Sequence, residues 1–249
     1  MEKFLGIILS VVLSLCLAGC GNTANGTAQA GVLVMATNAE FPPYEYHEGS
    51  QIVGIDAEIA AAIAEKMGCE LKIEDIAFDS IIPEVSSGKA DMGMAGMTVT
   101  EDRKQNVDFS DTYAIARQVV IVRADSGIES LDDLEGLTIG VQQGTTGDIY
   151  ASEDYGDDHI ERYAKGMEAV QALTQGKVDA VIIDNEPARV FVSENEGLVI
   201  LDEAYADEEY AIAVKKGNTE LLNQINAALA ELKADGTLDA IVAKYISAE

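Results

Sequence analysis

Short apolar runs alternate along the chain with longer segments whose apolar residues recur every three or four positions. The run VLVMAT, from Val32 to Thr37, is typical of a buried strand. The segment GIDAEIAAAIAEKMG ends in a glycine and predicts an amphipathic helix. Its apolar face is formed by Ile55, Ile59, Ile63 and Met67.

The same alternation continues toward the C-terminus. CELKIED, QVVIVR and LTIGV predict further strands, and SIIPEVSSG predicts a short helix that ends at Gly88. The C-terminal segment predicts two helices divided at Gly236. Because strands alternate with helices, we expect an α/β fold with parallel-sheet lobes. No long linker rich in Pro or Ser interrupts the middle, so two lobes would be joined by strands.

The N-terminal segment predicts export and lipid attachment. LGIILSVVLSLCL is too short for a comfortable membrane span, and it ends in LAGC, which resembles the lipobox of bacterial lipoproteins. We therefore expect residues 1–19 to be a cleaved signal peptide and Cys20 to carry the lipid (palmitate) anchor at the outer face of the membrane or in the periplasm. Residues 20–30 would form a flexible tether. The alternative is an uncleaved anchor with an incidental cysteine.

Charge and cysteine content exclude several classes of function. The chain has 44 acidic and 16 basic residues and a formal net charge of −28, which excludes nucleic acid as a partner because phosphate binding needs the opposite sign. Cys16 would leave with the signal, so Cys69 has no disulfide partner and is expected in the core.

Two segments of the chain repeat one pattern. SSGKADMGMAGMT and TQGKVDAVIIDNE share a glycine, a lysine and an aspartate before a strand, and eight residues beyond each glycine lie Gly96 and Asp184. Ligands of open α/β sheets bind at the carboxyl ends of strands, so these residues could face each other across a cleft. The alternative is two unrelated units that share a common turn sequence.

A candidate anion site follows two of the predicted strands. Arg103 lies beyond Thr100, which allows either a solvent-exposed residue behind a helix cap or a guanidinium that holds an anion. The turn Gly144–Thr146 opens a helix and offers backbone N–H groups, but no lysine follows its glycines, so nucleotide binding is not expected. With Asp184 opposite, the set is complementary to a zwitterion.

These residues resemble the bacterial extracellular solute-binding proteins for polar amino acids (family 3), which serve ABC importers. The matching segments are ATNAEFPPYEY, GIDAEIAAAIAEKMG, AGMTVTEDRKQNVDFSDTY, GVQQGTTGD and VDAVIIDNEPA. The resemblance implies that Arg103 and the backbone at Thr98 and Thr145 hold the ligand α-carboxylate. Asp184 and the carbonyl of Gly96 would hold its α-ammonium.

The resemblance also implies the rest of the site and the lobe boundaries. Phe41 and Phe78 would enclose the ligand side chain, and Asn38, Met97 and Thr146 complete the predicted site. Two α/β lobes are expected, with residues 31–113 and 209–249 in the first and 114–208 in the second. The chain would cross between them near 112–118 and 204–210, and the protein would act as a monomer with an ABC permease and ATPase.

The ligand side chain is the least determined feature. Two aromatic faces favour a cationic or flat group, and Glu40 or Asp79 would add to a preference for arginine or lysine. Asn38 stands where related binders often carry Asp, and its amide would suit glutamine as the second choice. No second cation falls in a cleft motif, so glutamate and aspartate are not expected.

Other functions are less compatible with the sequence. Met92, Met94 and Met97 suggest core packing rather than a soft-metal site, since only His47 and His159 are available and cysteines are not clustered. We expect no metal, no cofactor and no catalytic residue. A secreted cyclohexadienyl dehydratase is the enzymatic alternative on this fold, but neither histidine falls in a cleft motif. A sensory module is a third alternative, but no membrane span follows KYISAE.

Overall fold

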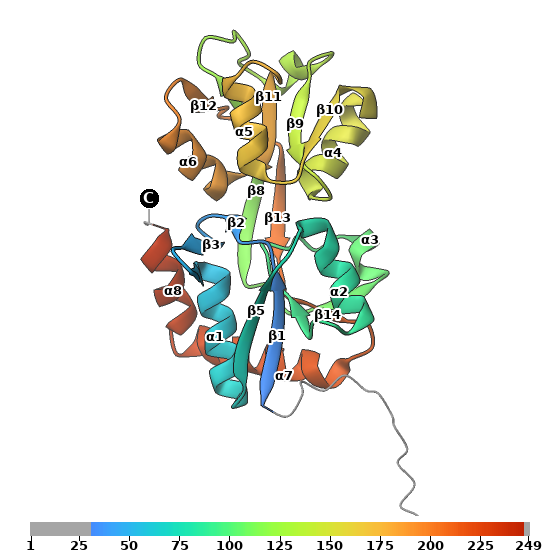
Figure 1. Cartoon of the computed structure of the whole chain (residues 1–249), viewed down its shortest axis with the longest axis vertical. Coiled ribbons are helices and arrows are strands. Elements are labelled where there is room, and N and C mark those ends of the chain that lie inside the picture. The colour runs from blue at the N-terminus through green and yellow to red at the C-terminus, as the bar shows by residue number, and fades with distance from the viewer. Residues whose placement is uncertain (1–30, 247–249) are drawn as a thin grey trace, which may run out of the picture.

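Two large β-sheets, a small three-stranded sheet and the helices around them form the protein, whose computed structural model describes residues 31–246 (Figure 1). The predicted signal peptide, Cys20 and the tether lie outside the described residues. We call the two halves lobe 1 and lobe 2. Lobe 1 contains β1 (Val32–Thr37), β2 (Glu40–Phe41), β3 (Glu45–Glu48), β4 (Gln51–Val53), α1 (Ile55–Met67), β5 (Glu70–Asp75), η1 (Phe78–Ser80), α2 (Ile81–Ser87), β6 (Met92–Gly93), α3 (Glu101–Lys104), β7 (Val107–Phe109), β14 (Ala213–Lys215), α7 (Thr219–Ala234) and α8 (Thr237–Tyr245). Lobe 2 contains η2 (Leu131–Leu134), β9 (Ile139–Gln142), α4 (Thr146–Tyr155), η3 (Asp157–His159), β10 (Ile160–Tyr163), α5 (Gly166–Thr174), β11 (Ala180–Asp184), α6 (Asn185–Glu194) and β12 (Leu198–Ile200). The strands β8 (Ala114–Arg123) and β13 (Ala206–Tyr210) run between the lobes.

Lobe 1 is a mixed sheet covered by helices on both faces. Its strand order is β5-β1-β6-β14-β7, with β5, β1 and β6 parallel and β14 antiparallel to its neighbours. Alternate residues of β1 enter different cores: Leu33 and Met35 pack with α1, α7 and α8, whereas Ala36 packs with α2. The face of α1 predicted from its period is fully buried at Ile55 and Ile59.

Lobe 2 repeats this layered arrangement. Its strand order is β10-β9-β11-β8-β12, in which β10, β9 and β11 are parallel and β8 is antiparallel to β11. Val119 and Ile121 of β8 join the core that includes α5 and α6, and Val120 and Val122 join the opposite core, which includes Ala151 of α4. The prediction of two α/β lobes is confirmed, and the structure adds that each sheet combines parallel strands with an antiparallel one.

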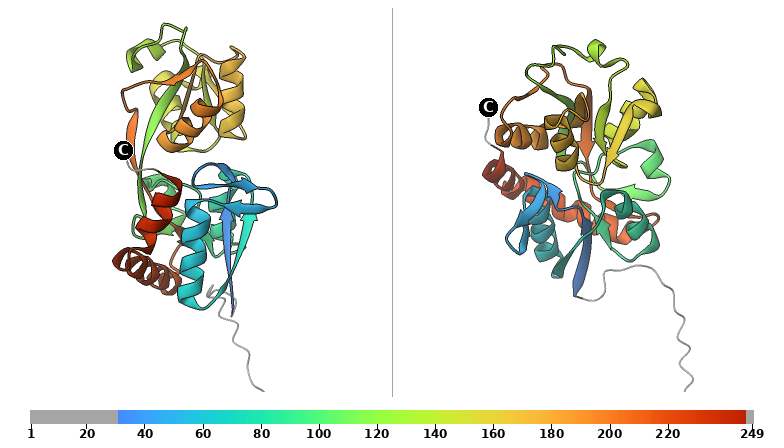
Figure 2. Two further views of the ribbon diagram at one scale, coloured as in Figure 1. Left: turned by 90° about the vertical axis from the view of Figure 1, so that its left-hand side faces the viewer. Right: turned by 45° about the horizontal axis from the view of Figure 1, so that its top comes forward.

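Two antiparallel strands connect the lobes. Residues 206–210 of β13 pair with residues 114–118 of β8, while the far end of β8 pairs with β11 and β12 inside lobe 2. Figure 2 shows the two strands side by side between the lobes. After β13 the chain re-enters lobe 1, where α7 and α8 pack on α1. They are divided at Gly236, as predicted, and its φ of 79° suits the left-handed region that glycine adopts readily.

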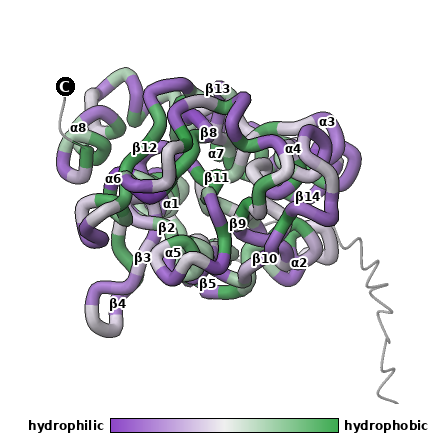
Figure 3. Tube along the Cα trace, turned by 90° about the horizontal axis from the view of Figure 1, so that it is seen from above, coloured by the Kyte–Doolittle hydropathy of each residue, from purple (hydrophilic) through white to green (hydrophobic). Residues whose placement is uncertain are grey.

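The small sheet β2-β3-β4 lies beside the cleft end of lobe 1, and its β3–β4 hairpin projects from the body (Figure 3). Cys69 is a free, half-buried thiol at the edge of the core. None of the helices between residues 31 and 246 is long and apolar enough to cross a membrane.

Candidate functional site

A cleft lies between the lobes, where the carboxyl ends of the parallel strands point toward each other. Its cavity volume is about 10 Å³, room for roughly one water molecule, so in this closed form the cleft is nearly filled by its own side chains. The lining residues are Asn38, Phe41, Glu45, Phe78, Ala95, Gly96, Thr98, Arg103, Gln142, Thr145, Thr146 and Asp184. All but one of the residues predicted from the sequence are therefore brought together, Met97 being the exception.

Each of the two interpretations of Arg103 is partly right: the residue follows a helix cap, and its side chain is buried in the cleft. The Thr100 hydroxyl accepts the Arg103 backbone N–H at 3.2 Å and caps the one-turn helix α3, as the first interpretation expects. The Arg103 side chain is not solvated, however, because the residue is only 7% exposed. Its Nη1 donates to the Thr98 carbonyl at 2.8 Å and its Nη2 to the Gly144 carbonyl of lobe 2 at 3.2 Å.

The Arg103 guanidinium also lies over the Phe78 ring, 5.4 Å from its centroid, where a cation is attracted to the ring face. Burial lowers the pKa of Arg103, against the opposing effect of Glu208 and Asp184. The group nevertheless stays charged at neutral pH, because an arginine loses its proton only far above that range. The cleft therefore contains a buried, positively charged guanidinium.

Asp184 supplies the opposite charge from the end of β11. It is 5% exposed, and its Oδ1 accepts a hydrogen bond from the Tyr210 hydroxyl. Burial, and after it the charge of Glu208, raises the pKa of Asp184 from 3.8 to about 8. Glu208 is itself buried on β13 and accepts hydrogen bonds from Thr98 Oγ1 and Gln118 Nε2, each at 3.0 Å. Two carboxyl groups thus lie together where the connecting strands meet the cleft.

The repeated sequence pattern has a structural counterpart in each lobe. Asp91 accepts the backbone N–H of Val34 at 2.9 Å, and Asp179 accepts that of Thr138 at 3.0 Å. In both lobes this aspartate secures the start of a neighbouring segment, and the strand after it leads to the cleft. Gly96 is required there, because its φ is 51° and a Cβ would come within 3.0 Å of the Phe41 ring.

Hydrogen bonds across the cleft hold the lobes together. Gln142 Nε2 donates to Asn38 Oδ1 at 2.9 Å, and Gln143 Nε2 donates to Asp79 Oδ2 at 2.9 Å. These contacts join residues of different lobes, so the structure is a closed form.

At the mouth, Lys165 of lobe 2 and Glu40 of lobe 1 form an ion pair of 2.5 Å. Asn38 also donates to the Ile76 carbonyl at 2.9 Å, so both ends of its amide are bonded to protein. The two acids and the amide suggested for side-chain recognition, Glu40, Asp79 and Asn38, therefore all take part in contacts between the lobes.

The predicted anion seat at residues 144–146 is smaller than expected. Thr145 is the N-cap of α4, and its hydroxyl accepts the Asp148 backbone N–H at 3.3 Å. The Gly144 N–H, which was expected to face an anion, instead donates to Asp148 Oδ2 at 2.9 Å. Thr146 is buried and its hydroxyl accepts from Gln118 at 3.3 Å.

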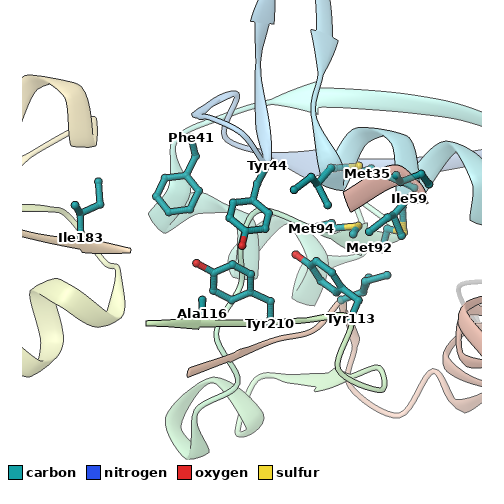
Figure 4. Close-up of a cluster of buried hydrophobic side chains, with 14 of the residues drawn as sticks. Met35, Phe41, Tyr44, Ile59, Met92, Met94, Tyr113, Ala116, Ile183 and Tyr210 are labelled. Carbon is teal, nitrogen blue, oxygen red and sulfur yellow. The ribbon is translucent and has the colours of Figure 1, made fainter. Parts of the chain in front are cut away.

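Aromatic side chains form the wall of the cleft on lobe 1. The Phe41 and Tyr44 rings are 6.1 Å apart with their planes inclined by 28°, and Tyr44 meets Tyr210 edge-on at 5.1 Å. Figure 4 shows Phe41 between Ile183 of lobe 2 and Tyr44, with the Tyr44 hydroxyl pointing toward Tyr210. Phe41 is buried, and Phe78 is half-buried under the guanidinium.

The methionines lie in the core. Met92 and Met94 pack with α1, and Met97 is fully buried with Ile81 and Val85 of α2. The prediction that Met97 lines the site is corrected by this position. The positive φ of Gly96 turns the chain after the strand and directs the next side chain inward.

Several cleft residues were not found from the sequence. Gln142 ends β9 two positions before the predicted turn at Gly144, so its strand-end position was an available signal. Glu45 and Glu208 had none, since each lies in a polar stretch that predicts exposure, yet they are 1% and 5% exposed.

The sequence and the two-lobed fold relate this protein to a known family. Residues 33–248 match the bacterial extracellular solute-binding proteins, family 3. The chain belongs to this family. It is 35% identical, over all of both chains, to the arginine-binding extracellular protein ArtP of Bacillus subtilis (strain 168). The predicted family is thus confirmed, and so is the expectation that the protein binds a solute and is not an enzyme.

Solved structures agree with the fold. The P235GK mutant of ArgBP from T. maritima has a TM-score of 0.83 and 43% identity, covering 88% of this chain and 96% of that one. An ancestral arginine-binding protein bound to glutamine has the same TM-score and identity, covering 88% and 99%. The protein is therefore related to extracellular proteins that bind amino acids for ABC transporters.

Proposed function

We propose that this solute-binding protein captures a free basic amino acid, arginine or lysine, by closure of its two lobes and presents it to an ABC importer. The observation that carries the proposal is the set of charged groups in the cleft: Arg103 lines it together with the buried acids Asp184 and Glu45, and a third buried acid, Glu208, accepts a hydrogen bond from Thr98 of the lining. A zwitterion offers one charge of each sign. The remaining acids favour a ligand with an additional positive charge.

The clamp for the zwitterion follows from the positions of the two charged groups. Arg103 holds the α-carboxylate through its planar fork, which matches carboxylate geometry, and Asp184 holds the α-ammonium. Gly96 and Thr98 lie between them on lobe 1 and bring backbone groups to the ligand. The Phe41 and Phe78 rings suit the stem and the cationic end of the side chain.

Closure is supported by the contacts between the lobes. The bonds from Gln142 to Asn38 and from Lys165 to Glu40 form only when the lobes meet, and Arg103 also bridges to lobe 2 through Gly144. Bending of the two connecting strands opens the cleft and admits the ligand. Closure then excludes water, which strengthens each charged contact.

Glutamine is the second candidate ligand, because a related ancestral arginine-binding protein is bound to glutamine. The Asn38 amide gives this alternative less support than its sequence position suggested. Its oxygen and its nitrogen are already bonded to Gln142 and to the Ile76 carbonyl, so it has little capacity to recognise a ligand amide.

A monomer attached through Cys20 to the outer face of the membrane, or held in the periplasm, completes the proposal. It would act with an ABC permease and ATPase. LAGC and the short apolar segment before it support the anchor.

A thermal-shift screen over the free amino acids tests the ligand assignment, because a bound ligand stabilises the native state according to its affinity. Arginine and lysine are expected to give the largest shifts, glutamine a smaller one, and glutamate and aspartate none. A largest shift with glutamate or an aliphatic amino acid, and none with arginine or lysine, would refute the assignment of a basic ligand.

A further inference from the structure

Glu45 of β3 is a buried acid in the cleft that the contacts between the lobes do not use. It is 1% exposed and lines the cleft. No described donor forms a hydrogen bond to either of its carboxyl oxygens. An ionised carboxylate in such a position loses its hydration without compensation, so the side chain needs either a proton or a positively charged partner.

The neighbour of Glu45 determines where that proton lies. Asp56 of α1 accepts at Oδ2 the backbone N–H of Gly96 at 2.9 Å and the Tyr113 hydroxyl at 2.8 Å, while its Oδ1 has no described donor. Two donors favour the ionised form of Asp56. A protonated Glu45 then provides the missing donor to Asp56 Oδ1.

The protonation behaviour of the two acids agrees with this geometry. Burial, and after it the Asp56 carboxyl, raises the pKa of Glu45 well above its ordinary value. Burial raises the pKa of Asp56 only to about 6, because the Gly96 and Tyr113 donors oppose the effect. Asp184 of β11 and Asp75 of β5 also act on Glu45, and both raise its pKa.

The acids first suggested for side-chain recognition are occupied elsewhere. Glu40 is paired with Lys165 at 2.5 Å, and Asp79 accepts from Gln143 at 2.9 Å. Glu45 lines the same cleft without a cationic partner, and acids from α1, β5 and β11 surround it. A positively charged side chain that enters the cleft therefore finds its acceptor at Glu45.

We propose that Glu45 recognises the cationic end of the ligand side chain and exchanges its proton for that cation, an inference that rests on the proposed binding of a basic amino acid. The O–H bond of the Glu45 carboxyl breaks, and the proton passes to solvent before the cleft closes. The carboxylate that forms pairs with the guanidinium or ammonium of the ligand. A neutral side chain brings no charge to offset ionisation, so Glu45 keeps its proton and its bond to Asp56.

Calorimetric titration of the whole exported chain with arginine, in two buffers of different ionisation enthalpy, counts the protons released on binding. Glu45→Gln is the test variant, because its amide can still donate to Asp56 and the fold should persist. Glu48→Gln is the matched control, since Glu48 lies exposed on the same strand. Citrulline, which has the shape of arginine but a neutral side-chain end, is the second ligand, and a thermal melt checks the fold of each variant.

We expect the wild type and Glu48→Gln to release about one proton more than Glu45→Gln on binding arginine, with at least a tenfold loss of arginine affinity in Glu45→Gln alone. Where that variant binds arginine too weakly to titrate, the wild type should release about one proton more with arginine than with citrulline. Equal proton release or unchanged arginine affinity in Glu45→Gln would overturn the role of Glu45 while leaving basic-ligand binding in place. Failure of the wild type to bind arginine or lysine would overturn both proposals.

Discussion

Arg103→Ala is the most direct test of the clamp. The substitution removes a guanidinium that is 7% exposed and bonded to the Thr98 and Gly144 carbonyls. It also leaves the α-carboxylate of the ligand without its positive partner in a closed cleft. We expect the fold to persist, because the N-cap of α3 is formed by Thr100 and the Arg103 backbone rather than by its side chain.

The size of the effect follows from the burial of this group. Truncation of one partner of a buried charge pair costs about 2–5 kcal/mol, which corresponds to a loss of affinity between about 30-fold and about 4,000-fold. Loss of the bond to Gly144, which joins the lobes, adds about 0.5–1.5 kcal/mol against closure. Arg103→Lys should fall between wild type and alanine, since it keeps the charge but cannot span both carbonyls as a planar fork.

Isothermal titration calorimetry with arginine and lysine measures this loss directly. Lys104→Ala is the control, because Lys104 lies on the same short helix but is exposed and paired with Glu101. Near wild-type affinity in Arg103→Ala, with an unchanged melting temperature, would show that the side chain holds neither the ligand nor the closed form.

Three further substitutions test closure, the ammonium site and anchoring. Gly144→Ala should keep the lobes apart, because its Cβ would lie 3.0 Å from Asp79 of the other lobe. Small-angle scattering should show a more open form, and calorimetry an affinity at least about tenfold lower. Gly156→Ala is the control, because Gly156 also has a positive φ but open space around it. Asp184→Asn should weaken amino-acid binding in calorimetry by about 2–5 kcal/mol, because the amide carries no charge to pair with the ligand ammonium in the closed cleft. Cys20→Ser should move the protein from the membrane to the soluble fraction, and unchanged fractionation would refute the anchor.

Features with a regular period were predictable from the sequence. The face of α1 and the division at Gly236 follow from helical spacing and from glycine at a helix boundary. Arg103 and Asp184 were predictable because they follow strands, and strand ends in open sheets border the cleft. Both kinds of signal are local, so a single chain is sufficient to find them.

Buried acids were not predictable in this way. Glu208 receives its hydrogen bonds from Thr98 and Gln118, which are 110 and 90 positions away, and Glu45 meets Asp56 only after the small sheet folds against α1. In a chain of net charge −28 almost any acid appears to belong to a solvated surface. Only the packing of distant segments distinguishes the few that enter the cleft.

Because of the same buried acids, closure of the two lobes depends on a bound ligand. In an open form Asp184 and Glu208 would face water, whereas closure removes them from water together and raises the pKa of Asp184 to about 8. For a raised carboxyl pKa, the contribution to stability is complete below the ordinary pKa of 3.8 and is lost as pH rises through about 8. Near neutral pH an empty cleft must therefore take up a proton or accept an uncompensated charge when it closes. The ammonium of a bound amino acid removes this penalty in the closed form alone, and a ligand shifts such an equilibrium only through its different affinities for the two forms. The groups that bind the cation are thus the groups that make the closed form depend on it.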